Sequence, residues 1–173
     1  MVSQKKRLYV ALYPSGVTNN AERKYHWAFL VGPKVEDAEE VPGIRYHVKN
    51  TMLNVWEYEE VKLRNVKNTI NLLARIMIGK IEDEARLVKI FQEVPLVQND
   101  ENWRCRTWVK NALAAIENDG KAVGTSILDW EKIEAKAREY VGEKTAAGRY
   151  KNIDDLKLPK PTWDMIDNKE KLP

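Results

Sequence analysis

Apolar residues gather in short runs along the first half of the chain, and turn residues close each run. The runs span residues 8–13, 25–31, 44–49, 54–63 and 72–81. They are rich in β-branched and aromatic residues and are bounded by Pro, Gly and Asn, which is typical of strands. The near-continuous apolar run at 25–31 predicts a central strand covered on both faces. The partial alternation at 54–63 predicts a strand with one face in water.

The run at 72–81 could also begin a longer helix. Gly79 lies in its middle, and glycine inside a helix costs about 1 kcal/mol, so we favour a strand. Residues 82–93 carry apolar side chains at helical spacing, and Pro95 ends that pattern.

Two further helices are expected. Asp100 or Asn102 can cap the first, which runs to about residue 118, and the second covers residues 128–141. Beyond Gly148, prolines and charges predict an extended tail over residues 151–173, with Trp163 pinning part of it. Strands before helices predict an α+β class. We expect one domain over residues 1–150, with an antiparallel sheet of about five strands followed by helices.

Composition narrows the choice of partners. The net charge is only +3, and basic residues are dispersed among acids, so no nucleic-acid partner is expected. No apolar run approaches the roughly 20 residues of a membrane span. The positive N-terminus is followed by a short run that reads as a strand rather than a signal peptide. A single cysteine forms no internal disulfide, which agrees with a reducing compartment, so we expect a cytoplasmic protein.

The single cysteine, Cys105, is the first candidate for chemistry. If Asn102 caps the helix, Cys105 lies in the first turn, where the helix dipole and free N–H groups lower a thiol pKa. Arg104 and Arg106 flank it and would act in the same direction. The alternative is a buried structural cysteine, because Cys105 shares one helical face with apolar residues of the same helix.

The two histidines of the chain, His26 and His47, fall in neighbouring predicted strands. If these strands pair antiparallel, both imidazoles project from one face. A catalytic imidazole would have to reach the Cys105 sulfur, and a further polar group would have to orient that imidazole. Alternatively, His26 is a core residue satisfied by a carbonyl and His47 is half-exposed. A metal site is disfavoured because no close-spaced ligand pair occurs, and no cofactor fingerprint is present.

The segments at residues 26–32 and 105–109 resemble the permuted branch of the papain-like fold. This branch includes the lecithin:retinol acyltransferase family and the PPPDE peptidases, and is related to the NlpC-type peptidases. The strand motif matches at His26, Ala28 and Gly32, and the helix motif at Cys105 and Val109. The sequence departs from it with Trp108 in place of phenylalanine and Arg104 in place of asparagine. The chain is also similar to a group of uncharacterised fungal proteins.

The resemblance implies a cysteine-dependent hydrolase or an acyl or amide-bond transferase that works through a thioester. Its substrate would be a peptide, an amide or an ester, and no cofactor is implied. In that mechanism His26 would take the thiol proton or hold a thiolate–imidazolium pair, and His47 would fix its tautomer. The Cys105 N–H would supply one oxyanion donor. The candidates for a second are Asn102, Tyr9 and Tyr13.

Several tryptophans could line a cleft near Cys105, or else belong to the core. They are Trp27, Trp56, Trp103 and Trp108. Arg45 and Arg75 could bind a carboxylate, although strand arginines usually lie in solvent. The acids at 57, 59 and 60 predict a solvated strand face.

Two other functions fit the same residues. The first is a non-catalytic papain-like domain that binds a peptide or protein partner, with Cys105 inert. The second is a tailoring enzyme that uses the same site for acyl transfer or cyclisation on a small metabolite. Tryptophan walls would favour an aromatic or lipid-like substrate, whereas an open polar groove would favour a peptide.

Overall fold

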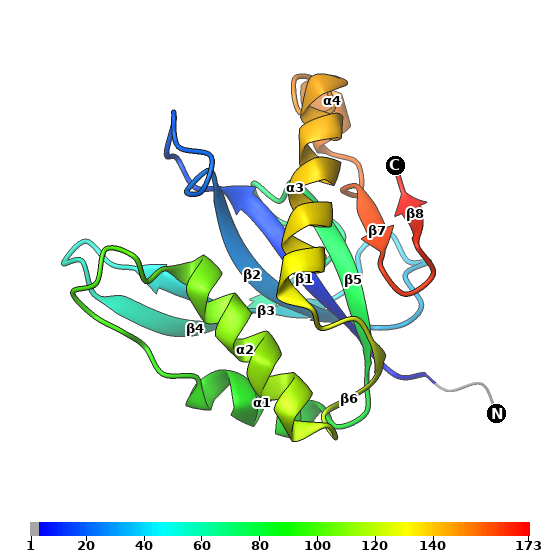
Figure 1. The fold of residues 1–173 in the computed structure, drawn as a ribbon. Coiled ribbons are helices and arrows are strands. Elements are labelled where there is room, and N and C mark those ends of the chain that lie inside the picture. Colours follow the sequence, from blue (N-terminus) through cyan, green and yellow to red (C-terminus); the bar gives the residue numbers. More distant parts are fainter. Residues whose placement is uncertain (1–3) are drawn as a thin grey trace.

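The apolar runs of the first half form strands, as their composition predicts, in a computed structural model that describes residues 4–173 (Figure 1). The strands are β1 (Arg7–Pro14), β2 (Tyr25–Gly32), β3 (Gly43–Asn50), β4 (Trp56–Leu63), β5 (Ala74–Ile81), β6 (Val123–Ser126), β7 (Thr162–Asp164) and β8 (Lys169–Leu172). The helices are α1 (Glu84–Glu93), α2 (Cys105–Asp119), α3 (Trp130–Ala146) and α4 (Ile153–Leu156). The α+β class is therefore confirmed. Between residues 4 and 173, no helix has the length and apolar character that a bilayer crossing needs.

The strands form one mixed sheet of eight, larger than the antiparallel sheet of about five that we expected. Their order is β4-β3-β2-β1-β5-β7-β8, and β6 pairs with one end of β5. Neighbours from β4 to β5 are antiparallel, whereas β5 and β7 are parallel. The strand prediction for residues 72–81 is confirmed, because Gly79 pairs with Leu8 on one side and Ser126 on the other.

The prediction of an extended tail beyond residue 150 is wrong. β7 adds to the sheet beside β5, and β8 pairs with β7. The prolines that led us to expect a tail lie next to β7, and they do not prevent it from pairing. The Pro161 carbonyl, for example, accepts a hydrogen bond from the Arg75 N–H at 3.0 Å. Trp163 then packs against Tyr140 of α3, with ring centroids 5.7 Å apart. The last residues are thus an integral part of the sheet.

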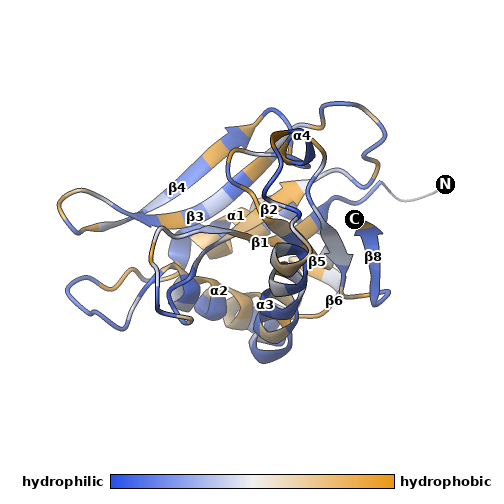
Figure 2. Cartoon of the chain, turned by 90° about the horizontal axis from the view of Figure 1, so that it is seen from above, coloured by the Kyte–Doolittle hydropathy of each residue, from blue (hydrophilic) through white to orange (hydrophobic). Residues whose placement is uncertain are grey.

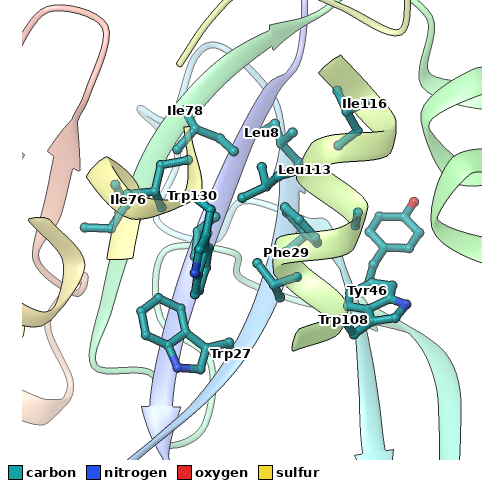
Figure 3. Close-up of a cluster of buried hydrophobic side chains, with 14 of the residues drawn as sticks. Leu8, Trp27, Phe29, Tyr46, Ile76, Ile78, Trp108, Leu113, Ile116 and Trp130 are labelled. Carbon is teal, nitrogen blue, oxygen red and sulfur yellow. The ribbon is translucent and has the colours of Figure 1, made fainter. Parts of the chain in front are cut away.

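Helices α1, α2 and α3 cover one face of the sheet (Figure 1). The central strands are largely apolar, and α2 and α3 carry hydrophilic stretches away from them (Figure 2). Aromatic rings join the layers: Phe29 of β2 lies 4.8 Å from Phe91 of α1 and 5.7 Å from Trp108 of α2. Trp27 lies beside Trp130 at the start of α3, 5.1 Å between centroids (Figure 3). This packing fixes where α2 begins relative to β2.

Loops cover the other face of the sheet, so β2 is covered on both sides, as predicted. Val41, Val66 and Leu72 from these loops pack against strand residues such as Leu30. This face also buries an arginine, whose charge is paired internally as described below.

We expect Trp108→Ala to lower the free energy of unfolding by about 3–5 kcal/mol, because it removes a fully buried ring from the contact between α2 and the sheet. Urea denaturation followed by circular dichroism measures this.

The control is Leu53→Ala, which truncates an apolar side chain that is 85% exposed in the β3–β4 turn. Its effect should stay within about 0.5 kcal/mol. Equal losses in the two variants would contradict the assigned role of Trp108.

Candidate active site

The two histidines meet where β2 and β3 stop pairing. Backbone pairing between these antiparallel strands ends at Phe29 and Tyr46. Beyond that point the strands are joined by side chains, with His26 Nε2 lying 2.8 Å from His47 Nδ1. Tyr46 belongs to the core on the helix side, so the neighbouring His47 projects from the opposite face. The predicted side-by-side arrangement of the histidines is confirmed.

Cys105 is the first residue of α2, and Arg104 is the N-cap in an extended conformation. The Arg104 N–H donates to the Thr107 hydroxyl at 3.1 Å, which holds the chain at the helix start. The cap predicted at Asn102 is therefore wrong. Asp100 instead accepts a hydrogen bond from the Asn102 N–H in the loop before the helix, at 2.9 Å. The thiol thus lies two residues closer to the helix end than expected.

The Cys105 sulfur lies in a mostly buried environment, and the residue is only 8% exposed. Burial raises the pKa of this thiol, while the backbone N–H groups of Trp27 and Arg106 and the charge of Arg104 oppose that rise. The expected lowering of the pKa is therefore wrong, because desolvation outweighs the helix terminus. Contact with the Trp27 backbone places the sulfur beside the strand position that directly follows His26.

A carboxylate extends the histidine pair. His47 Nε2 lies 3.1 Å from a Glu59 oxygen. Burial lowers the pKa of His47, and burial together with the charges of His47 and Arg45 lowers the pKa of His26 to about 4. Both imidazoles are therefore neutral near pH 7.

Neutrality fixes the tautomers of this chain. A carboxylate only accepts, so His47 Nε2 carries the hydrogen that bonds Glu59. His47 Nδ1 then accepts from His26 Nε2–H across the 2.8 Å contact. His26 Nδ1 is left with a free lone pair, which is the form that a general base requires.

Glu59 is the residue that the sequence interpretation missed, since the acids of this strand were expected to face water. Antiparallel pairing sets Glu59 directly opposite His47. A hydrogen bond from Lys49, followed by that from His47, lowers the pKa of the Glu59 carboxyl. The sequence could have revealed this pair, because a β3–β4 hairpin with its turn centred near residue 53 places residue 59 opposite residue 47.

Cys105, His26 and His47 line one cleft of about 660 Å³. The walls combine apolar surface with many charged side chains, which are Glu22, Arg23, Arg45, Lys49, Arg104 and Arg106. Across the part of the chain that the structure describes, no hydrogen bond joins Cys105 to His26. Within residues 4–173, no cluster of three or more His, Cys, Asp or Glu side chains could hold a metal ion.

Tyr13 is the one predicted oxyanion donor that lines the cleft. Its ring lies 6.1 Å from the His26 ring, and its hydroxyl is 2.9 Å from that of Thr69. Asn102 is exposed and lies outside the cleft lining. Tyr9 is buried on the loop-covered face of the sheet and also lies outside the cleft lining, so neither of these two residues faces the cleft.

The tryptophans divide between core and cleft. Trp27 and Trp108 are fully buried in the core on the helix side, so their predicted place in the cleft wall is wrong. Their rings carry the packing of α2 and α3 on β2. Trp56 alone among the expected tryptophans lines the cleft.

These features define an α+β protein with a thiol and a histidine pair in one cleft at the end of its sheet. The chain belongs to the family of unknown function DUF6914, whose model matches residues 5–172. No curated protein and no solved structure matches the chain. Because the family description names no activity, function has to be inferred from the cleft.

The histidine chain predicts a distinctive acid response. The folded pKa of His26, about 4, lies below the ordinary value of about 6.5, so the unfolded chain binds this proton first as the pH falls. The contribution of neutral, buried His26 to the free energy of unfolding is therefore fully present above about pH 6.5. It is lost as the pH falls from about 6.5 through 4. Between pH 7 and pH 4 the wild type should lose about 3 kcal/mol more unfolding free energy than His26→Gln.

Imidazole ¹⁵N NMR provides the direct check, with His26→Gln used to assign the two histidines. At pH 7 His26 Nδ1 and His47 Nε2 should give the signals of an unprotonated and a protonated nitrogen, respectively. A His26 midpoint near 6.5 would contradict the assignment.

Alkylation tests the state of the thiol. Iodoacetamide should modify native Cys105 with an apparent pKa above the ordinary value of about 8.5, because burial raises the pKa of the thiol. The same chain unfolded in urea, which contains this one cysteine, is the matched control and should titrate near the ordinary value. A native midpoint below that of the unfolded chain would show that the helix terminus dominates after all.

Proposed function

We propose that this protein is a cysteine-dependent hydrolase or acyl or amide-bond transferase that forms a thioester on Cys105. One observation carries the proposal: Cys105, at the start of α2, shares a cleft with the hydrogen-bonded chain from His26 through His47 to Glu59. A nucleophile, a base and groups that orient the base are the set that covalent acyl transfer requires.

The same arrangement supports a permuted papain-like fold of the NlpC type. The strand that carries His26 precedes the helix that carries Cys105, and α2 packs on that strand with its N-terminus at the histidine end. A polar residue on the following strand, His47, orients the first imidazole. Strands β6, β7 and β8 and helix α3 enlarge this core.

The chemical steps follow from the tautomers. His26 Nδ1 removes the Cys105 proton while the sulfur attacks the substrate carbonyl, and His47 with Glu59 stabilises the imidazolium that forms. The Cys105 N–H at the free end of α2 donates to the oxyanion. The carbon–heteroatom bond then breaks, His26 returns the proton to the leaving group, and a thioester remains. Water, an amine or an alcohol completes the reaction by attacking that thioester.

Substrate binding has to complete the contact between Cys105 and His26, since they share no hydrogen bond at rest. Catalytic contacts commonly tighten in this way when a substrate enters. In this resting state both groups are neutral, so His26 acts as a general base rather than as half of a preformed ion pair.

A second candidate is supported by the burial of the thiol. Cys105 is 8% exposed and its pKa is raised by burial, which also suits an inert cysteine in a domain that binds a peptide or protein. The charged side chains of the cleft wall favour a peptide or a polar small molecule over a lipid-like substrate in either case.

Intact-protein mass spectrometry after mixing with 4-nitrophenyl hexanoate tests the proposal. The native protein should gain one hexanoyl group at Cys105. Over the same time Cys105→Ala should remain unmodified. His26→Ala should acylate about 10²–10⁴-fold more slowly, because it lacks the general base.

The urea-unfolded chain measures the reactivity of the same thiol without the site, and unfolding curves show whether each variant is folded. Native acylation faster than that of the unfolded chain at pH 7 supports catalysis. Slower native acylation would leave Cys105 as an inert residue and favour the binding function.

A further inference from the structure

Positive side chains predominate in the wall of the cleft. Three of them have carboxylate partners, in the pairs Lys49–Glu59, Arg104–Glu22 and Arg106–Glu134. Arg23 donates to the Glu101 backbone carbonyl at 3.2 Å. Among the described residues, Arg23 and Arg45 are thus the cleft cations without a carboxylate partner.

Arg45 is the unpaired cation built into the floor of the cleft. It lies on β3 two positions before His47, and therefore on the same face of the sheet. Its guanidinium lies 5.3 Å from the centre of the Tyr13 ring, which in turn lies against His26. In the part of the chain described, Arg45 Nε is buried and has no hydrogen-bond acceptor. Leaving such a donor unsatisfied is costly.

The second strand arginine, Arg75 of β5, shows what the fold does when no ligand can reach a guanidinium. Arg75 is fully buried, and Glu36 accepts two hydrogen bonds from it, at 2.7 and 3.0 Å. Its Nε donates to the Thr162 hydroxyl at 3.0 Å. Each guanidinium nitrogen of the enclosed Arg75 thus has an acceptor. Within residues 4–173 no acceptor is supplied to Arg45, the arginine that opens on the cleft.

We propose that Arg45 binds a carboxylate of the substrate, so that the molecule presented to Cys105 carries a carboxylate in addition to its reacting carbonyl. The part of this proposal that places a reacting carbonyl at Cys105 rests on the proposed function, whereas the part in which Arg45 binds a carboxylate does not. Because Nε is enclosed, the two terminal Nη groups are the ones that line the cleft, and their two parallel N–H groups match the two oxygens of a carboxylate. The carboxylate itself does not react.

The size and walls of the cleft suit such a molecule. A volume of about 660 Å³ lies in the usual range for small-molecule sites. Tyr25 and Trp56 supply aromatic surface in the same cleft as Arg45 and Cys105, and an acyl chain of a few carbons would pack against it.

Matched esters test the reaction: 4-nitrophenyl hydrogen adipate and 4-nitrophenyl hexanoate differ at the chain end, which is a carboxylate in one and a methyl group in the other. Acylation of Cys105 by the adipate ester should be favoured in the wild type, after correction for hydrolysis in buffer. Arg45→Gln should lower the ratio of the adipate rate to the hexanoate rate by about 10- to 100-fold, because this ratio cancels any change in the base strength of His26. Arg64→Gln is the control, because that side chain is 85% exposed and pairs with Glu40 instead.

Calorimetry with disodium adipate and Cys105→Ala tests binding without chemistry. Adipate should bind, and adding Arg45→Gln should weaken binding by about 10- to 100-fold, whereas Arg64→Gln should not. Arg45→Lys keeps the charge but loses the two parallel N–H groups, so its affinity for adipate should fall between those of the Arg45 protein and Arg45→Gln. It serves as a second variant if Arg45→Gln fails to fold.

The outcomes separate the two proposals. Acylation without an adipate preference would overturn the role of Arg45 and leave the proposed function standing. Adipate binding that depends on Arg45, without acylation by either ester, would support the carboxylate site and overturn the proposed function. Tighter binding of inorganic phosphate than of adipate, or no adipate binding at all, would overturn the carboxylate assignment.

Discussion

The position of α2 on β2 is the constraint on which the candidate site depends. Phe29, Trp108 and Phe91 pack together between the helices and the sheet. This contact fixes the first turn of α2 at the end of β2, so that Cys105 faces the Trp27 backbone next to His26. Because close-packed rings tolerate little displacement, the core sets the geometry of the cleft.

Burial gives this site a particular electrostatic state. Desolvation raises the pKa of the thiol and lowers that of both histidines, so the resting groups are neutral. The chain of hydrogen bonds from His26 to Glu59 nevertheless leaves the lone pair of His26 Nδ1 ready to take a proton, with the Glu59 carboxylate at the other end of the chain. Such a site would acquire charge only when a substrate is present, and the carboxylate of Glu59 would then stabilise it.

The same fold treats two strand arginines in opposite ways. Arg75 is enclosed with Glu36, and that pair belongs to the architecture of the loop-covered face. Arg45 keeps its charge beside the histidines and lowers their pKa.

Local periodicity and turn residues were enough to predict the five strands of the first half, the helices of the middle, and two strand histidines that face one way. The other features depend on how the folded elements pack together. Burial reversed the expected pKa of Cys105, since desolvation depends on what packs over a helix terminus. Pairing across the sheet turned the predicted tail into β7 and β8, and set Glu59 opposite His47. Long-range register and burial are properties of the assembled core, and no single stretch of the sequence encodes them.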